Sequence, residues 1–256
     1  MKVILRMKEN NIQIIILAAG HGKRMKNDEV PKVLVPLHGK PMIAHLLESI
    51  VASGVCERPL LVVGQKADMV KAALGEKYDY VFQQDQLGTG HAVAMTRPVL
   101  EGKVAHVMVL YGDHPLVSVK TIRSIADEHF TKKTALTMAT VRLPDFNDWR
   151  AGFADFGRII RDAQGNVIAI VEKRDATASQ LGITEVNPSY FCFRADWLWN
   201  QLALLRNNNS QHEYYLTDLV SAACRDREEI ATVQIDAREA LGVNTPEQLN
   251  VITRAA

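Results

Sequence analysis

The sequence predicts an α/β fold in which a mostly parallel mixed sheet carries helices on both faces. Short apolar runs alternate with amphipathic stretches through the first half of the chain, and this alternation is typical of such sheets. The chain has 256 residues, enough for one large domain or two small ones. Hydrophobic residues make up 47% of it, so a substantial core is expected.

Apolar composition predicts strands at residues 13–17, 60–63, 80–83, 107–111 and 135–141. Helical spacing of apolar side chains predicts a helix over 42–53, and less regular patterns favour helices over 67–74, 91–99 and 119–130. Ligands of parallel sheets bind beyond the carboxyl ends of the strands. Gly20 follows the first predicted strand and Asp113 follows the fourth, so both are expected at that edge.

The second half has a different pattern. Strands are expected at 157–161, 167–172, 185–193 and 229–235, and the first two flank a predicted hairpin turn at 162–166. Helices are expected over 195–205, 216–225 and 246–254, with a polar loop at 207–211. We interpret these elements as additions that form one wall of a cleft over the sheet.

Composition argues against several classes of protein. The net charge of +1 gives no bulk electrostatic reason to expect a nucleic-acid or anionic-membrane partner. Neither a signal peptide nor an apolar run of about 18 residues is evident. Cys56, Cys192 and Cys224 are far apart and odd in number, which favours a reducing, cytoplasmic location over a disulfide framework.

A glycine turn follows the first predicted strand. Leu17, Ala18, Ala19 and Gly20 lead into a second glycine at position 22. Glycines let successive backbone N–H groups approach a polyanion, and Arg24 and Lys32 would add positive charge, so the segment is a candidate phosphate site. No Gly-Lys-Ser/Thr closes it as in a P-loop, and the third glycine of a dinucleotide fingerprint would fall at Met25. A purely steric role for the glycines is the alternative.

A second glycine loop spans residues 83–90. The amides of Gln83 and Gln86 are able to donate to and accept from a base edge, and Gly88 and Gly90 would let the backbone lie near a flat ring. The alternative is a polar turn before a helix.

Other polar residues are candidates for a cation and a sugar. Asp113 is a possible Mg²⁺ ligand together with substrate phosphates, and Asn244 a possible second one. Helix capping is the alternative for both, and for Asn244 taken alone it is the favoured one. Gly157, Glu172 and Asn187 would suit sugar hydroxyls and an N-acetyl group, although each alone has a structural explanation.

Nine short motifs occur together along the chain. They are LAAGxGxRM at 17–25, PKVL at 31–34, GKPM at 39–42, QLGTGHA at 86–92, YGD at 111–113, GRI at 157–159, IVEK at 170–173, EYYLTD at 213–218 and GVN at 242–244. In this order they closely resemble the uridylyltransferase half of the bacterial N-acetylglucosamine-1-phosphate uridyltransferases.

The resemblance implies a Rossmann-like nucleotide-diphospho-sugar transferase fold in one domain. Residues 12–145 would form its nucleotide-binding half, 146–240 its sugar-binding part and 241–256 a C-terminal helix that returns to the metal site. UTP and N-acetylglucosamine-1-phosphate would be the substrates and Mg²⁺ the cofactor. The implied roles are triphosphate binding by Leu17–Gly20, Arg24 and Lys32, uracil recognition by Gln83, Gln86, Gly88 and Thr89, sugar contacts by Gly157, Glu172 and Asn187, and Mg²⁺ ligation by Asp113 and Asn244.

The chain departs from the family pattern at several positions. His21 and Lys23 stand where the family has Lys and Thr, Pro188 and Ser189 replace the Thr-Gly that follows the sugar-binding asparagine, and His212 replaces a glycine. A required positive φ at Ser189 would be penalised. The sequence therefore does not determine which sugar phosphate is the substrate. Transfer to another sugar phosphate or from another nucleotide, and a non-catalytic nucleotide-sugar sensor, are the alternatives.

The hexapeptide repeats of the family's acetyltransferase half are also absent from this sequence, and 12 residues follow Asn244. We therefore expect no acetylation of glucosamine-1-phosphate by this chain, and the oligomeric state stays open.

Overall fold

The computed structural model describes residues 11–20, 25 and 30–255. None of the described helices is long and apolar enough to cross a membrane. The elements in chain order are β1 (Ile12–Ala18), η2 (Lys32–Leu34), β2 (Pro36–Leu37), β3 (Lys40–Pro41), α2 (Met42–Ser53), β4 (Leu60–Val63), α3 (Ala67–Leu74), β5 (Asp79–Phe82), α4 (Thr89–Ala94), α5 (Arg97–Leu100), β6 (His106–Tyr111), α6 (Val119–Lys132), β7 (Leu136–Arg142), η3 (Asp148–Asp155), β8 (Gly157–Arg161), β9 (Val167–Val171), α7 (Ala178–Leu181), β10 (Glu185–Asn187), β11 (Phe191–Arg194), α8 (Ala195–Leu202), α9 (Asp218–Arg225), β12 (Ile230–Gln234), η4 (Ala237–Ala240) and α10 (Pro246–Ala255).

The main sheet mixes parallel and antiparallel strands, as predicted. Its order is β5-β4-β1-β6-β11-β7-β10-β8-β9, with β12 beside β7. The first four strands are mutually parallel, β11 runs antiparallel to both β6 and β7, and β12 runs parallel to β7. The parallel part thus lies where strands and helices alternate in the sequence.

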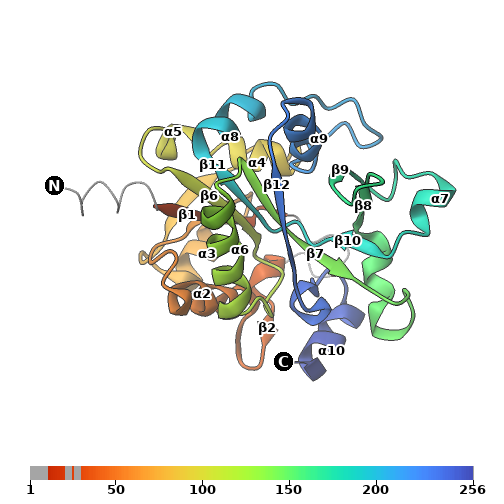
Figure 1. Cartoon of the computed structure of the whole chain (residues 1–256). Coiled ribbons are helices and arrows are strands. Elements are labelled where there is room, and N and C mark those ends of the chain that lie inside the picture. Colours follow the sequence, from red (N-terminus) through yellow and green to blue (C-terminus); the bar gives the residue numbers. More distant parts are fainter. Residues whose placement is uncertain (1–10, 21–24, 26–29, 256) are drawn as a thin grey trace.

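Helices cover both faces of the sheet, which confirms the predicted layers. Ile14 and Ile16 of β1 pack into the core under α2, α3 and α6, whereas Ile15 between them packs into the core under α4, α8 and α9. This alternation follows from the two-residue period of a strand. Figure 1 shows α8 and α9 on one side of the sheet and α2 and α6 on the other.

Two predicted elements are interrupted in the structure. The strand expected over 185–193 is divided into β10 and β11, because Pro188 has no N–H to donate and Ser189 has a φ of 66°. The helix expected over 91–99 is divided into α4 and α5, and Pro98 lies in the first turn of α5, where a missing N–H costs nothing. The 3-10 helix η3, which places Phe153 in the core, was not predicted.

Three parts of the chain meet at one edge of the sheet. Because β1, β4, β5 and β6 are parallel, their carboxyl ends lie together, and the predicted phosphate, base and metal residues follow β1, β5 and β6. The β8–β9 hairpin approaches from the other end of the sheet (Figure 1). The segment after η4 also returns here, since Val243 N donates to Asp113 O at 2.9 Å.

Candidate active site

Two adjoining pockets lie at the carboxyl ends of the parallel strands. Their cavity volumes, which include open solvent, are about 770 and 580 Å³. The larger is lined by Leu17, Ala18, Ala19, Gly20, Lys32, Val33, Gln83, Gln86, Gly88, Thr89, Ala92, Tyr111, Asp113 and Glu213. The smaller is lined by Tyr111, Asp113, His114, Asp155, Phe156, Gly157, Glu172, Asn187, Pro188, Ser189 and Asn244. They share Tyr111 and Asp113, and we call them the base-side and the sugar-side pocket.

The structure brings the predicted site residues into these two pockets. All the residues predicted from the first half line the base-side pocket, apart from Arg24. Gly157, Glu172, Asn187 and Asn244 line the sugar-side pocket. Arg24 lies outside the described residues, as do His21 and Lys23. The roles of the residues that do line the pockets remain predictions.

Gly88 is required by the path of the chain. Its φ is 110°, and a Cβ there would lie 2.7 Å from the carbonyl oxygen of Tyr214. That carbonyl accepts a bond of 2.8 Å from Gly90 N, and Tyr214 N donates to Leu87 O at 2.8 Å. The glycine loop is therefore paired with the segment around Tyr214, which leaves no room for a side chain at Gly88.

The two predicted base-binding glutamines have structural contacts as well. Gln83 is buried, and its Nε2 lies 3.3 Å from Gly88 O and 3.0 Å from His91 Nδ1. Gln86 Nε2 donates to the carbonyl oxygen of Ala19, so the glutamine loop is joined to the glycine turn after β1. Both amides are thereby held in fixed positions at the wall of the base-side pocket.

Glu172 is a half-buried carboxylate in the sugar-side pocket. Its Oε1 accepts a bond of 3.0 Å from Thr217 Oγ1. Burial raises the pKa of the carboxyl group, and Asp218 and Asp175 add to this rise. Gly157 faces it, and a Cβ on Gly157 would lie 2.7 Å from Ile170 Cγ2 and 3.3 Å from Glu172 Oε1. Glycine is therefore needed to bring this carboxylate to the pocket wall.

Asn187 makes a compact turn with Ser189. Ser189 N donates to Asn187 Oδ1 at 2.9 Å, and Asn187 Nδ2 donates to Ser189 Oγ at 3.1 Å. Ser189 has a φ of 66°, which is the positive and therefore strained value that the comparison with the family pattern led us to expect a penalty for. Both ends of the Asn187 amide are thus engaged within the loop, which leaves fewer of its hydrogen-bonding positions for a ligand.

Lys32 joins the two predicted metal ligands. Its Nζ donates to Asp113 Oδ2 at 2.5 Å and to Asn244 Oδ1 at 2.9 Å. Burial alone would raise the pKa of the Asp113 carboxyl, but the charge of Lys32 outweighs it, so that pKa is lowered. One carboxylate and one amide oxygen therefore converge on a single positive charge. Both are hard oxygen donors of the kind that Mg²⁺ prefers.

The donor set is small, however. Among the described residues, no group of three or more His, Cys, Asp or Glu side chains is placed to hold a metal ion. A cation held by Asp113 and Asn244 would need further ligands, and substrate phosphates commonly supply them at Mg²⁺ sites. The residues present thus fit a cation that arrives with a phosphorylated substrate.

Residues 14–215 match the MobA-like NTP transferase domain. The chain belongs to this family. It is 39% identical over 242 residues to the bifunctional protein GlmU of Brevibacillus brevis, which covers 94% of this chain and 50% of that protein. It is 40% identical over 235 residues to the bifunctional protein GlmU of Enterococcus faecalis, and the match covers 91% of this chain and 49% of that protein. It is 37% identical over 244 residues to the bifunctional protein GlmU of Desulfotalea psychrophila, and the match covers 94% of this chain and 69% of that protein. The chain spans about half the length of the first two relatives.

Three residues that line the two pockets were not among the predicted site residues, although Tyr111 and Glu213 lie within the motifs YGD and EYYLTD. Tyr111 lies between the two pockets, His114 lines the sugar-side pocket and Glu213 lines the base-side pocket. Burial raises the pKa of Tyr111 and lowers that of His114. Tyr111 and His114 belong to the same strand end as Asp113, so their position in the sequence was an available signal.

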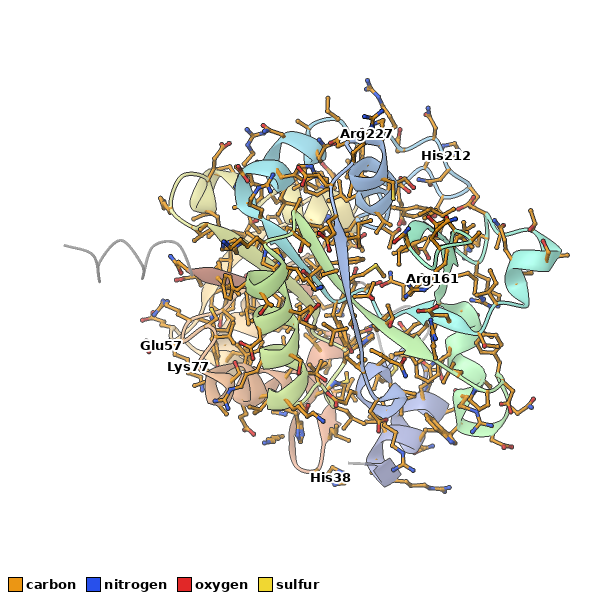
Figure 2. All side chains as sticks on the ribbon, in the orientation of Figure 1. His38, Glu57, Lys77, Arg161, His212 and Arg227 are labelled. Carbon is orange, nitrogen blue, oxygen red and sulfur yellow. The ribbon has the colours of Figure 1, made fainter. Side chains whose placement is uncertain are left out.

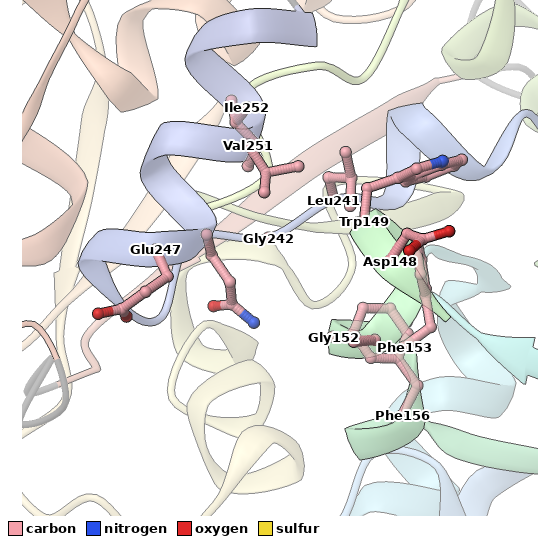
Figure 3. A pocket seen from close by; sticks show the side chains of 12 residues that line it. Asp148, Trp149, Gly152, Phe153, Phe156, Leu241, Gly242, Glu247, Val251 and Ile252 are labelled. Carbon is pink, nitrogen blue, oxygen red and sulfur yellow. The ribbon is translucent and has the colours of Figure 1, made fainter. Parts of the chain in front are cut away.

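A further pocket lies behind the Asn244 loop of this domain. Figure 3 shows Trp149, Phe153 and Phe156 from the η3 region facing Leu241, Val251 and Ile252 from the C-terminal segment. Its lining includes Gln248, whose Oε1 accepts a bond of 2.7 Å from Asn244 N. The backbone of a predicted metal ligand is therefore held by a residue of this apolar pocket.

The other positive-φ residues of the domain include exposed ones. His38, His212 and Arg227 have φ values of 48°, 55° and 58°. Figure 2 shows them well separated on the outside of the molecule, His38 beside β2 and His212 beyond α9. Unlike Ser189, His212 lines neither pocket.

Proposed function

We propose that this domain transfers a uridylyl group from UTP to N-acetylglucosamine-1-phosphate, which gives UDP-N-acetylglucosamine and pyrophosphate. The observation that carries the proposal is the pair of pockets that share Tyr111 and Asp113. Two substrates in these pockets would meet at the carboxylate of Asp113. The similarity to proteins named GlmU supports the choice of nucleotide and sugar.

The chemistry requires positioning more than proton transfer. A sugar phosphate is largely dianionic at neutral pH because its second pKa is about 6. One of its oxygens forms a bond to the α-phosphorus of UTP, and the bond from that phosphorus to pyrophosphate breaks. No general base is needed, so the chain has to align the two substrates and offset their charge.

The described residues divide these tasks. The turn from Leu17 to Gly20 would hold the triphosphate with Lys32, and Gln83, Gln86, Gly88 and Thr89 would hold the uracil. Gly157, Glu172 and Asn187 would contact the sugar. Mg²⁺, when held by Asp113 and Asn244, would offset negative charge on the phosphates. Arg24 would add a further positive charge at the triphosphate.

A second candidate keeps the reaction and changes the sugar. The Asn187 amide is engaged at both ends by Ser189, so its contact with an N-acetyl group would have to replace one of these bonds. This observation favours a sugar phosphate whose recognition depends less on Asn187, such as glucose-1-phosphate.

A substrate panel tests both candidates. The chain is incubated with Mg²⁺, each of UTP, CTP, dTTP and GTP, and each of N-acetylglucosamine-1-phosphate and glucose-1-phosphate. Pyrophosphate release and the nucleotide sugar are both measured. We expect turnover with UTP and the N-acetylated sugar. Preference for glucose-1-phosphate would establish the second candidate. Binding of UDP-sugar without turnover of any pair would overturn both and indicate a sensor.

A further inference from the structure

His114 and Tyr190 form a buried pair beside the sugar-side pocket. His114 Nδ1 lies 2.6 Å from Tyr190 Oη, and Tyr190 Oη donates to the carbonyl oxygen of Glu239 at 2.9 Å. The exposed fractions are 7% for His114 and 0% for Tyr190. His114 follows Asp113 directly, whereas Tyr190 precedes β11 and Glu239 belongs to η4. Three distant segments therefore define the orientation of one imidazole ring.

The hydrogen bonds of this pair determine the tautomer of the ring. A carbonyl oxygen only accepts, so the hydroxyl hydrogen of Tyr190 is directed at Glu239. Tyr190 Oη then accepts from His114, which requires the hydrogen of the imidazole on Nδ1. In the neutral ring, Nε2 consequently carries a lone pair instead of a hydrogen.

The lone pair of Nε2 lies close to the predicted cation site. Asp113 Oδ1 lies 3.9 Å from Nε2, is also an acceptor and is beyond hydrogen-bond distance, and the charge of Lys32 also acts on this ring. A Cβ on Gly242 would lie 2.5 Å from Nε2, so the glycine there keeps this nitrogen accessible. His114 and Asn244 both line the sugar-side pocket with Asp113.

We propose that His114 Nε2 is a third protein donor at the cation site, beside Asp113 and Asn244. The inference rests on the proposed function for the existence of that site. Two metal–ligand bonds of about 2.1 Å each would span the 3.9 Å between Nε2 and Asp113 Oδ1. His114 Nδ1 donates to Tyr190 Oη, and metal-bound histidines typically donate a hydrogen bond from their second ring nitrogen in this way.

A nitrogen donor changes which cation the site prefers. Mg²⁺ favours oxygen ligands, whereas Mn²⁺, Co²⁺ and Zn²⁺ also accept imidazole. The site would therefore bind Mn²⁺ more tightly than Mg²⁺, and a large part of that preference would depend on His114.

The test detects histidine nitrogen bound to Mn²⁺ by pulsed electron paramagnetic resonance. The full chain is loaded with Mn²⁺ and tripolyphosphate, which contains no nitrogen, in samples with natural and ¹⁵N-labelled histidine. We expect a directly bound imidazole signal that changes with the label. It should disappear in His114→Val and Asp113→Ala, and persist in His45→Asn, because His45 is bonded to Leu37 O and lines neither pocket.

Tyr190→Phe removes the acceptor of His114 Nδ1 while keeping the buried ring. We expect it to weaken Mn²⁺ binding by about tenfold, as outer-shell changes commonly do. Mn²⁺ bound without a histidine signal, a signal that survives His114→Val, or no Mn²⁺ binding at all would overturn the inference. Uridylyl transfer in the first of these cases would leave the proposed function intact, whereas a histidine signal in a chain without transfer would support only the cation site.

Discussion

Lys32 Nζ lies 2.5 Å from Asp113 Oδ2, so that the first residue of η2 is joined to a residue just beyond the end of β6. The side chains of both are 12% exposed, so the pair is largely shielded from water. The charge of Lys32 also lowers the pKa of Asp113 against the effect of burial. This ion pair places the ammonium group of Lys32, which lines the base-side pocket, against the carboxylate that both pockets share.

Replacement of Lys32 by methionine should therefore impair catalysis. By analogy with loss of one preorganised donor, we expect kcat/KM for UTP to fall roughly a hundredfold. The control is Lys40→Met, because Lys40 pairs with Glu48 at the surface and lines neither pocket. Steady-state kinetics measure the effect, and circular dichroism checks that each variant is folded. Equal rates for the two variants would exclude Lys32 from the site.

Gly88→Ala tests the fit of the base-side loop. The new Cβ would collide with Tyr214 O, and we expect a loss of unfolding free energy on the order of 3 kcal/mol, as for other overpacked and strained sites. Gly102→Ala is matched to it, since Gly102 also has a positive φ of 74° but no atom within 4 Å of its Cβ position. Its cost should be about 1 kcal/mol. Urea unfolding of both variants measures the difference, which would be absent if the loop moves freely away from Tyr214.

The raised pKa of Glu172 predicts a pH dependence of stability. The folded chain keeps the proton of Glu172 at pH values where the unfolded chain has lost it, so stability should fall as pH rises from 4.5 through the higher folded pKa. Glu172→Gln removes this dependence and should raise Tm relative to the parent chain at pH 7 but not at pH 4. Thermal unfolding across this range is the measurement.

Glu185→Gln should have the opposite sign. Burial alone would raise the pKa of Glu185, but its bonds to Arg161 outweigh this and lower it. The carboxylate therefore stabilises the fold above pH 4.5, and this contribution is lost as pH falls through the lowered pKa. The variant should have a lower Tm at pH 7. The same sign for both variants would contradict the assignment.

Ser189→Gly separates strain from sugar binding. Glycine tolerates the φ of 66°, and the loss of Ser189 Oγ releases Asn187 Nδ2. We expect KM for the sugar phosphate to change severalfold while KM for UTP stays constant. His212→Gly relieves a similar φ outside the pockets and should raise stability by about 1 kcal/mol with both KM values unchanged. A change in KM for UTP in either variant would argue against this division of the cleft.

Local sequence patterns predicted where the strands and helices lie, but they did not predict the contacts between side chains in the candidate site. The apolar runs at β1, β4 and β6 are strong signals because these strands are buried on both faces. Pro188 and Ser189 interrupt a strand that apolar composition extended through them, since composition does not report a missing N–H or a positive φ. The chain positions of Asp113 and Gly20 followed from the rule for parallel sheets.

Contacts between distant residues explain what the sequence left open. The pair of His114 and Tyr190 is 76 positions apart, and neither residue carries a motif of its own. One local contact was also not predictable: Asn187 and Ser189 are only two positions apart, but their hydrogen bonds depend on side-chain orientation, which spacing alone does not provide. Strand order had to be known before the two pockets were seen to share Asp113.

The bond between Lys32 and Asn244 connects residues 212 positions apart. No local folding event produces such a contact, because the intervening chain must first be ordered. During synthesis, the residues of β1, β4 and β6 would leave the ribosome well before Asn244, so Lys32 would still lack this partner. A nascent polypeptide should consequently be unable to turn over nucleotide until β12 and the segment after it, which contains Asn244, have emerged.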